Sequence, residues 1–356
     1  MKSSIFTRPA RLVTYAAVLA ATLTSAPAFA QDQEKDQESW KNQTPISVAV
    51  TEPDVRAAAN VTNSRVHVTP AHLPGAREVV QMFNDQFGAG PRVTTVPSPT
   101  PPAFYPADLA SGSGIKIVSA VSHAVYVNCT TIATCWGNPE GFLIDLGKSN
   151  FIHLLDQYVG STANNRYTDG AHVNVGYSIF GNTLYPHDIF AIVHAAAKLV
   201  GAGNGHIYHI FLPSGTDTCF DQSGVCYSPD NPASNVFCAY HESVTFSDIG
   251  HVLYTVEPFQ DVDGCRVATP SPNGQLADST NSALSHEFFE TVTDPNPPSG
   301  FVNRISLLLV GSEIGDECVP LANASGALVP TFLINGKNYE VQTEYSNHYH
   351  ACAVVP

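Results

Sequence analysis

Residues 276–292 read LADSTNSALSHEFFETV, and their composition predicts a helix. The chain is polar between residues 270 and 280, where the helix begins, and Asp294-Pro295 with the proline-rich breaker at 297–300 follows it. Proline cannot continue a helix, so this one is expected to end near Val292. On its N-terminal side, strand-like and helix-like segments alternate along the chain. The alternation predicts an α/β fold, with a mixed α+β arrangement as the alternative.

The other expected elements follow from residue type and spacing. Runs of β-branched and apolar residues predict strands, and apolar residues at helical spacing predict helices. Strands are expected at 115–127, 172–179, 206–212, 235–240 and 251–256, and helices at 76–87, 151–158 and 188–200. From Arg304 onward the chain predicts short strands and turns. The sequence therefore predicts one disulfide-containing globular domain with a mixed sheet at residues 110–356.

The N-terminus predicts export. Lys2, Arg8 and Arg11 precede or flank an apolar run at 12–23, and Ala28-Phe29-Ala30 has the small-x-small pattern of a cleavage site. The apolar run is about a dozen residues long, short of the roughly 20 that span a bilayer. Residues 1–30 are thus expected to be a signal peptide, and the mature protein is expected to be secreted, extracellular or periplasmic, with no membrane span.

The region after the signal peptide predicts little packed structure. Residues 31–60 are rich in Gln, Asp, Glu, Lys, Asn and Ala, a composition that buries too little apolar surface to offset the entropy of ordering. Six prolines between residues 91 and 106 predict a semi-extended linker. Residues 31–109 are therefore expected to form a disordered leader and a Pro-rich linker.

The charge balance excludes one class of partner. The chain has 16 Lys and Arg against 31 Asp and Glu, a formal charge of −15, and only 13% of its 356 residues are charged. Removal of residues 1–30 would take three basic and no acidic side chains and bring the charge to −18. Binding to nucleic acid needs a concentrated basic surface, so no nucleic-acid partner is expected.

Eight cysteines in an exported chain predict up to four disulfides. Sequence alone leaves 105 pairings open. The spacing favours short loops between Cys129 and Cys135 and between Cys219 and Cys226. Cys238 with Cys265 and Cys318 with Cys352 would instead tie separate segments together. A zinc–cysteine site is the competing interpretation, but the chain has no C-x-x-C pair.

The predicted helix at 276–292 contains His286-Glu287-Phe288-Phe289-Glu290, an H-E-x-x-E arrangement. Residues four apart share one face of a helix, so His286 and Glu290 can point at one metal ion, with Glu287 beside them as a general base. The arrangement resembles H-E-x-x-H, with glutamate in place of the second histidine. The alternative is a solvated helix face next to buried phenylalanines.

Further candidates lie on other segments. Glu313 could supply a third metal ligand, and Asp316 could accept a hydrogen bond from the imidazole of His286. One imidazole and two carboxylates neutralise a divalent cation, which weakens its effect on bound water. His241 would add a second imidazole. Zinc is expected if the site is catalytic, whereas an oxygen-rich ligand set suits manganese or calcium.

The order of these motifs resembles the exordium-like, phosphate-induced protein family. The resembling stretches are His286-Glu287-x-x-Glu290, Asp294-Pro295, Glu313-Ile314-Gly315-Asp316-x-Cys318, Asn335-Gly336-Lys337, Gln342, Cys352 and Phe237-Cys238-Ala239-Tyr240-His241. The resemblance is good over 284–352, weaker from 115 to 283 and absent before that, and it departs at 301–304, where an aromatic segment containing tryptophan is expected. It implies secretion and a shared fold. Plant members are cell-wall-associated proteins linked to growth responses, and the family as a whole has no established biochemical activity.

Two functions are compatible with these residues. The first is a metal-dependent, metallopeptidase-like hydrolase, in which His286, Glu290 and Glu313 hold a divalent metal and Glu287 is the base. Its substrate would be an unidentified extracellular molecule, such as a peptide or a cell-wall component. The second is a non-enzymatic extracellular or cell-envelope binding or signalling protein, in which the same carboxylates hold a structural ion or join a polar network.

Overall fold

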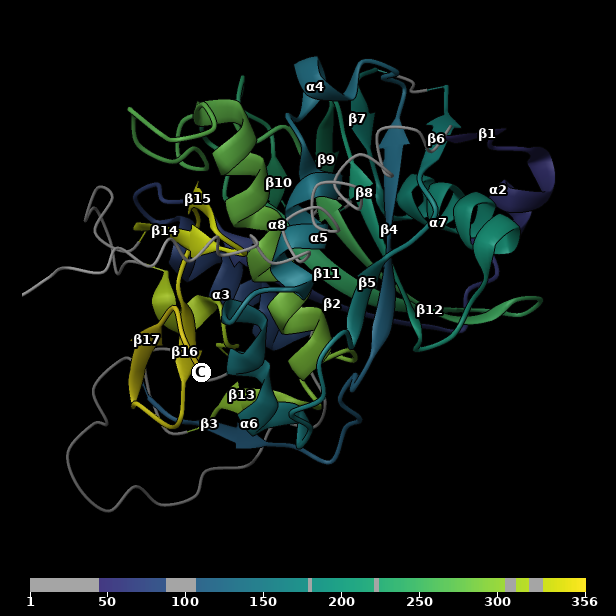
Figure 1. The fold of residues 1–356 in the computed structure, drawn as a ribbon. Coiled ribbons are helices and arrows are strands. Elements are labelled where there is room, and N and C mark those ends of the chain that lie inside the picture. Colours follow the sequence, from purple (N-terminus) through teal and green to yellow (C-terminus); the bar gives the residue numbers. More distant parts are fainter. Residues whose placement is uncertain (1–44, 88–106, 179–180, 221–223, 305–311, 320–328) are drawn as a thin grey trace, which may run out of the picture. The chain divides into compact units, whose positions relative to one another are not determined.

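The central feature of the structure, a computed structural model, is an eight-stranded mixed β-sheet (Figure 1). The structure describes residues 45–87, 107–178, 181–220, 224–304, 312–319 and 329–356, which belong to one compact unit. The predicted signal peptide at 1–30, the start of the predicted leader and the proline-rich segment lie outside the described residues. The predicted α/β class and mixed sheet are confirmed.

Seven strands form the main path of the sheet. In spatial order they are β1 (Ile46–Ala49), β6 (Val173–Gly176), β4 (Ala120–Val127), β8 (His206–Phe211), β12 (Gly250–Glu257), β11 (Phe237–Phe246) and β2 (Asn63–Pro70), and β5 (Tyr167–Asp169) pairs with β4 off this path. Neighbours from β1 to β12 run parallel, whereas β11 is antiparallel to both β12 and β2. The sheet thus joins a parallel centre to an antiparallel margin.

Helices cover both faces of the sheet, because its strands carry apolar side chains on both faces. One face packs against α2 (Glu52–Ala58), α3 (Ala76–Phe87) and α7 (Pro186–Val200). The other packs against α5 (Pro139–Gly147), the 3₁₀ helix η2 (Phe151–Leu155), α6 (Asp156–Val159) and α8 (Gln275–Thr293), with α4 (Ile132–Cys135) at its border. The α8 face is the one that carries the candidate site.

Short sheets complete the described part of the chain. They are β7 (Thr183–Leu184) with β9 (Asp217–Cys219) and β10 (Cys226–Tyr227), β3 (Leu109–Ser111) with β13 (Phe301–Asn303), β14 (Thr331–Ile334) with β15 (Lys337–Glu340), and β16 (Glu344–Ser346) with β17 (Ala351–Ala353). The 3₁₀ helix η4 (Asp316–Cys318) lies beside β16. The short strands and turns expected after Arg304 are therefore present in the described residues.

The predicted domain boundary is wrong for residues 45–87. β1 pairs with β6 and β2 pairs with β11, so this region belongs to the sheet instead of to a disordered leader. Val66, Val68, Val80 and Phe83 are buried in the core. Composition predicted disorder only for residues 31–60, and the later residues were placed outside the domain because they precede the proline-rich segment. A strand needs apolar residues only on its buried face, so a few alternating valines are enough.

Several element boundaries also differ from the predicted ones. α8 begins one residue before and ends one residue after the predicted 276–292. The expected helix at 151–158 is η2 followed by the single turn of α6. The strands expected at 115–127 and 172–179 are shorter, at Ala120–Val127 and Val173–Gly176, while the one expected at 235–240 extends to Phe246.

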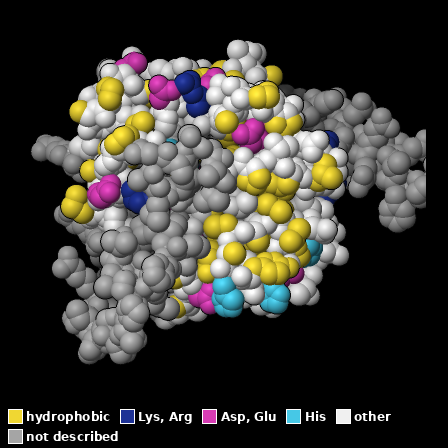
Figure 2. Space-filling model, turned by 90° about the vertical axis from the view of Figure 1, so that its left-hand side faces the viewer, with side chains coloured by type: hydrophobic (Ala, Val, Ile, Leu, Met, Phe, Trp, Pro, Cys, Tyr) yellow, Lys and Arg dark blue, Asp and Glu magenta, His cyan; other side chains and the backbone are white. Residues whose placement is uncertain are grey.

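All four favoured disulfides are confirmed: Cys129–Cys135, Cys219–Cys226, Cys238–Cys265 and Cys318–Cys352. The last of these ties η4 to β17, which are 34 residues apart. Among the described residues, no helix combines the length and apolar character needed to cross a membrane. On the face shown in Figure 2, few acidic or basic side chains stand among the other residues, as the low content of charged residues leads one to expect.

Candidate metal centre

The sheet places two histidines side by side beneath α8. In β2, Val66 and Val68 face the core on the α7 side, so the alternation of a strand turns His67 to the opposite face. His67 pairs directly with His241 of β11, and the centres of the two rings are 5.7 Å apart. Cross-strand partners share a face of the sheet, so both imidazoles point toward the helix that packs there.

α8 contributes the predicted H-E-x-x-E residues to the same place. The Nε2 atom of His286 lies 3.0 Å from Oε1 of Glu290, as the i, i+4 spacing predicts. His286 is 2% exposed, and Glu287 and Glu290 are fully buried. The alternative of a solvated helix face is therefore wrong.

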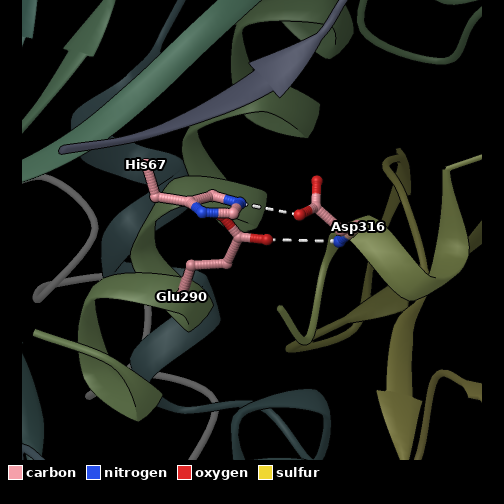
Figure 3. A group of neighbouring side chains, drawn as sticks. All are labelled: His67, Glu290 and Asp316. Carbon is pink, nitrogen blue, oxygen red and sulfur yellow. Dashed lines mark hydrogen bonds and ion pairs between the residues drawn. The ribbon is translucent and has the colours of Figure 1, made fainter. Parts of the chain in front are cut away.

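The segment at 312–319 adds two carboxylates. Glu313 places Oε1 3.3 Å from Nδ1 of His67 and Oε2 3.3 Å from Nε2 of His241. Asp316 places Oδ2 2.7 Å from Nε2 of His67, and its backbone N–H donates to Oε1 of Glu290 at 3.2 Å. Figure 3 shows His67 and Glu290 pointing at Asp316 from two different elements. We call His67, His241, His286, Glu287, Glu290, Glu313 and Asp316 the histidine–carboxylate cluster.

Close packing fixes this segment against α8. Gly315 sits so near His286 that a Cβ atom on it would lie 2.5 Å from Nδ1 of the ring. The backbone N–H of Tyr345 donates to the carbonyl of Ile314, and the disulfide of Cys318 anchors the far end. Glycine at 315 is therefore required by the close approach of backbone to imidazole.

The predicted partner of His286 is wrong. Oδ1 of Asp316 lies 3.9 Å from Nε2 of His286, too far for a hydrogen bond, and Asp316 bonds to His67 instead. The amide of Gln342 donates to Nδ1 of His286 at 3.0 Å and to the carbonyl of Gly315 at 2.7 Å. Gln342 therefore holds the ring that Asp316 was expected to hold.

Thr69 fixes the tautomer of His286 in this arrangement. The hydroxyl of Thr69 donates to Oε1 of Glu287 at 2.6 Å and lies 2.8 Å from Nε2 of His286. A hydroxyl has one proton, so it accepts from the Nε2–H of the imidazole. The neutral ring thus carries its proton on Nε2, and Gln342 satisfies Nδ1.

Several polar atoms of the cluster have no hydrogen-bond partner among the described residues. They are both ring nitrogens of His241, both oxygens of Glu313, Oε2 of Glu287 and Oε2 of Glu290. A buried polar atom without a partner costs about 1–3 kcal/mol, more when it is charged. These atoms are also the nitrogen and oxygen donors that divalent metals use, so the residues present fit a metal ion.

The charges of the cluster act strongly on one another. Burial, reinforced by the neighbouring carboxylates, raises the pKa of Glu287 and of Glu313 well above the usual range. Burial opposes the charge on His67, but Asp316 together with Glu290 and Asp294 outweighs it, and the pKa of His67 is raised to about 9. Burial lowers the pKa of His241 well below its usual value, which leaves a neutral imidazole with a free lone pair.

Two overlapping sets of side chains present ligand atoms within 4.8 Å of one another. The first is His67, Glu290 and Asp316, and the second is His241, Glu287 and Glu290. Glu290 is common to both sets, and neither set contains His286 or Glu313. The predicted trio of His286, Glu290 and Glu313 is therefore not one of these two sets, although all the predicted site residues lie in the same buried cluster. His67 was not predicted, because it lies in the region assigned to the leader. The alternation of Val66-His67-Val68 was the available signal for a strand with a polar side.

No protein-family model matches the chain, and neither a curated protein nor a solved structure was found to match it. The resemblance to the exordium-like family therefore stays a prediction. What the protein does has to be argued from the histidine–carboxylate cluster itself.

Proposed function

We propose that the protein is an exported metal-dependent hydrolase whose histidine–carboxylate cluster binds a divalent cation. One observation carries the proposal. Three imidazoles and four carboxylates from two strands, a helix and the 312–319 segment meet in a buried place, and several of their donor atoms lack hydrogen bonds. Such a group is costly without a cation and favourable with one.

The residues that would hold the cation are His286, Glu290 and Glu313, with His241 as a fourth donor. Two imidazole nitrogens and two carboxylate oxygens make a mixed four-donor set of the kind that zinc takes. For Nε2 of His286 to bind, its proton must move to Nδ1 and the amide of Gln342 must turn so that its oxygen accepts it.

Glu287 is the general base in this proposal. Thr69 donates to its Oε1 and leaves Oε2 without a hydrogen-bond partner among the described residues. When bound, the cation would polarise the scissile carbonyl and lower the pKa of a water. Glu287 would take a proton from that water and return it to the leaving amine of a peptide bond. The substrate would be an extracellular peptide or cell-wall component.

The proposed compartment rests on separate observations. Four disulfides are typical of proteins that fold in oxidising surroundings. The N-terminal pattern of residues 1–30 predicts export, and so does the resemblance to the exordium-like family. We therefore place the proposed hydrolase in the periplasm or the extracellular medium.

A second candidate function is a binding protein in which the cation is structural. The burial of the cluster favours it, because no residue of the cluster is more than 4% exposed. A catalytic metal keeps one position open to water and substrate, whereas a structural metal is closed off by its ligands.

Metal analysis and one substitution separate these candidates. The chain, purified from a secreting host, should contain zinc by mass spectrometry and should cleave fluorescein-labelled casein. Glu287→Gln should keep the metal and lose about 10²–10⁴-fold of the cleavage rate. Glu242→Gln is the matched control, since Glu242 is buried on the opposite face of β11, where it accepts from Ser64 and Tyr254.

Each outcome has a meaning. A metal-free protein that gains no thermal stability with zinc, manganese or calcium would contradict both candidate functions. Bound metal without cleavage of casein would favour the structural ion. Full activity in Glu287→Gln with metal retained would show that another group is the base.

A further inference from the structure

Glu313 faces two histidines at once. Its Oε1 lies 3.3 Å from Nδ1 of His67, and its Oε2 lies 3.3 Å from Nε2 of His241. The two histidines come from adjacent strands, and neither oxygen has a hydrogen-bond partner among the described residues. Because each oxygen of this carboxylate faces a different histidine, Glu313 is positioned to bridge two metal ions, one beside each histidine.

The two carboxylate oxygens of Glu290 also face different groups. Its Oε1 lies 3.0 Å from Nε2 of His286 and accepts from the backbone of Asp316, whereas its Oε2 points toward Nε2 of His241 at 3.7 Å. Glu290 also belongs to both sets of side chains whose ligand atoms lie within 4.8 Å. Two shared carboxylates therefore connect a His67–Asp316 side with a His241 side.

The number of buried carboxylates is compatible with two cations. The cluster contains four buried carboxylates, Glu287, Glu290, Glu313 and Asp316. Each divalent cation balances two ionised carboxylates, so four carboxylates can accommodate two cations. Arg77 also acts on Asp316, and three further buried carboxyls, Glu257, Asp294 and Glu344, interact with other members of the cluster.

We propose that the cluster binds a second divalent cation at His67 and Asp316, joined to the first by the carboxylates of Glu290 and Glu313. The inference rests on the proposed function and adds a second metal position to it. Pairs of metals held by bridging carboxylates clamp the attacking and leaving oxygens of a hydrolytic reaction. Histidine and aspartate together suit zinc or manganese.

Metal stoichiometry tests the second position. Protein purified from a secreting host, loaded with manganese and freed of excess by dialysis, should hold two equivalents. Its electron paramagnetic resonance spectrum should show an exchange-coupled pair. His67→Leu should hold one equivalent and give an uncoupled spectrum. His209→Leu is the matched control, because His209 is a fully buried histidine on β8 outside the cluster, and it should keep two equivalents.

The outcomes separate this inference from the proposed function. One equivalent in the unsubstituted protein would overturn the second position and leave the first intact, whereas no metal at all would overturn both. Two equivalents retained in His67→Leu would also overturn the assignment. If His67→Leu fails to fold by circular dichroism, the isosteric Asp316→Asn takes its place, with the same loss of one equivalent and of coupling expected.

Discussion

At the scale of single residues, the candidate site depends on how closely backbone and side chains approach. Gly315 lets the 312–319 segment pass His286, and Gln342 and Thr69 hold the two ring nitrogens. His67 and Asp316 form a buried ion pair in which each side chain depends on the other. Removal of either member of such a pair leaves the other charge buried without a counter-charge, which typically costs about 3–5 kcal/mol.

Gly315→Ala should disturb the cluster without touching a ligand. The new Cβ atom would lie 2.5 Å from Nδ1 of His286, so the ring or the segment must shift. We expect a loss of about 1–3 kcal/mol in the free energy of unfolding and at least about tenfold weaker zinc binding. Urea unfolding and titration calorimetry measure the two effects.

Gly205→Ala is the control for this substitution. No atom lies within 4 Å of the Cβ position there, and the residue does not have a positive φ angle. Zinc affinity should stay at the unsubstituted value. Equal losses of affinity in both variants would show that Gly315 has no special relation to the cluster.

At the scale of elements, the sequence predicted the helix well and the edge strand not at all. α8 lies within one residue of its predicted ends, because a polar segment and the prolines after Asp294 delimit it. The predicted pairing of His286 with Glu290 followed from helix geometry alone. The prediction worked wherever the contact was local in the chain.

The missing part of the site is non-local. His67 and Asp316 are 249 residues apart, and no spacing rule joins a strand near the N-terminus to a segment near the C-terminus. His67 becomes a candidate only once β2 pairs with β11 and sets it opposite His241. Strand register is a tertiary property, so the sequence could give the helix residues and His241 as candidates but could not give His67.

β8 makes a pH-dependent contribution to stability through His209. Burial lowers the pKa of His209 to about 3, against 6.5 for the exposed residue. Below pH 6.5 the unfolded chain binds a proton that the folded chain does not, so stability is lost as the pH falls toward 3. The His209→Leu variant has no imidazole at this position, so its unfolded chain does not bind that proton. Its stability relative to the unsubstituted protein should rise by about 2 kcal/mol between pH 8 and pH 5.

Urea unfolding at the two pH values measures that difference. His187→Leu is the control for loss of a histidine as such, because the His187 side chain is 65% exposed. Parallel stability curves for His209→Leu and the unsubstituted protein would contradict the expectation.

At the scale of the whole molecule, the disulfides differ in what they hold. Cys318–Cys352 closes a loop of 34 residues and anchors the segment that presents Glu313 and Asp316. Cys129–Cys135 closes a loop of six beside α4, which is not among the elements that build the cluster. Loop length sets most of the stability gained, and position decides whether the metal centre is affected.

Replacing both cysteines of each pair by serine should separate these effects. Loss of Cys318–Cys352 should lower the free energy of unfolding by about 3–4 kcal/mol and weaken zinc binding, whereas loss of Cys129–Cys135 should cost about 2 kcal/mol and leave zinc affinity unchanged. Denaturant titration and calorimetry provide the measurements. The same zinc affinity in both double variants would show that the 312–319 segment holds its place without the disulfide.

The cross-strand pair of His67 with His241 also determines when a metal can be acquired. The pair reaches Asp316 only after β2, β11, α8 and η4 have all come together, so no partial chain that stops before η4 presents a complete donor set. For a chain that crosses a membrane unfolded, assembly of the cluster would follow export. The ions available at the destination, and not those of the cytoplasm, would then decide which metal the protein carries.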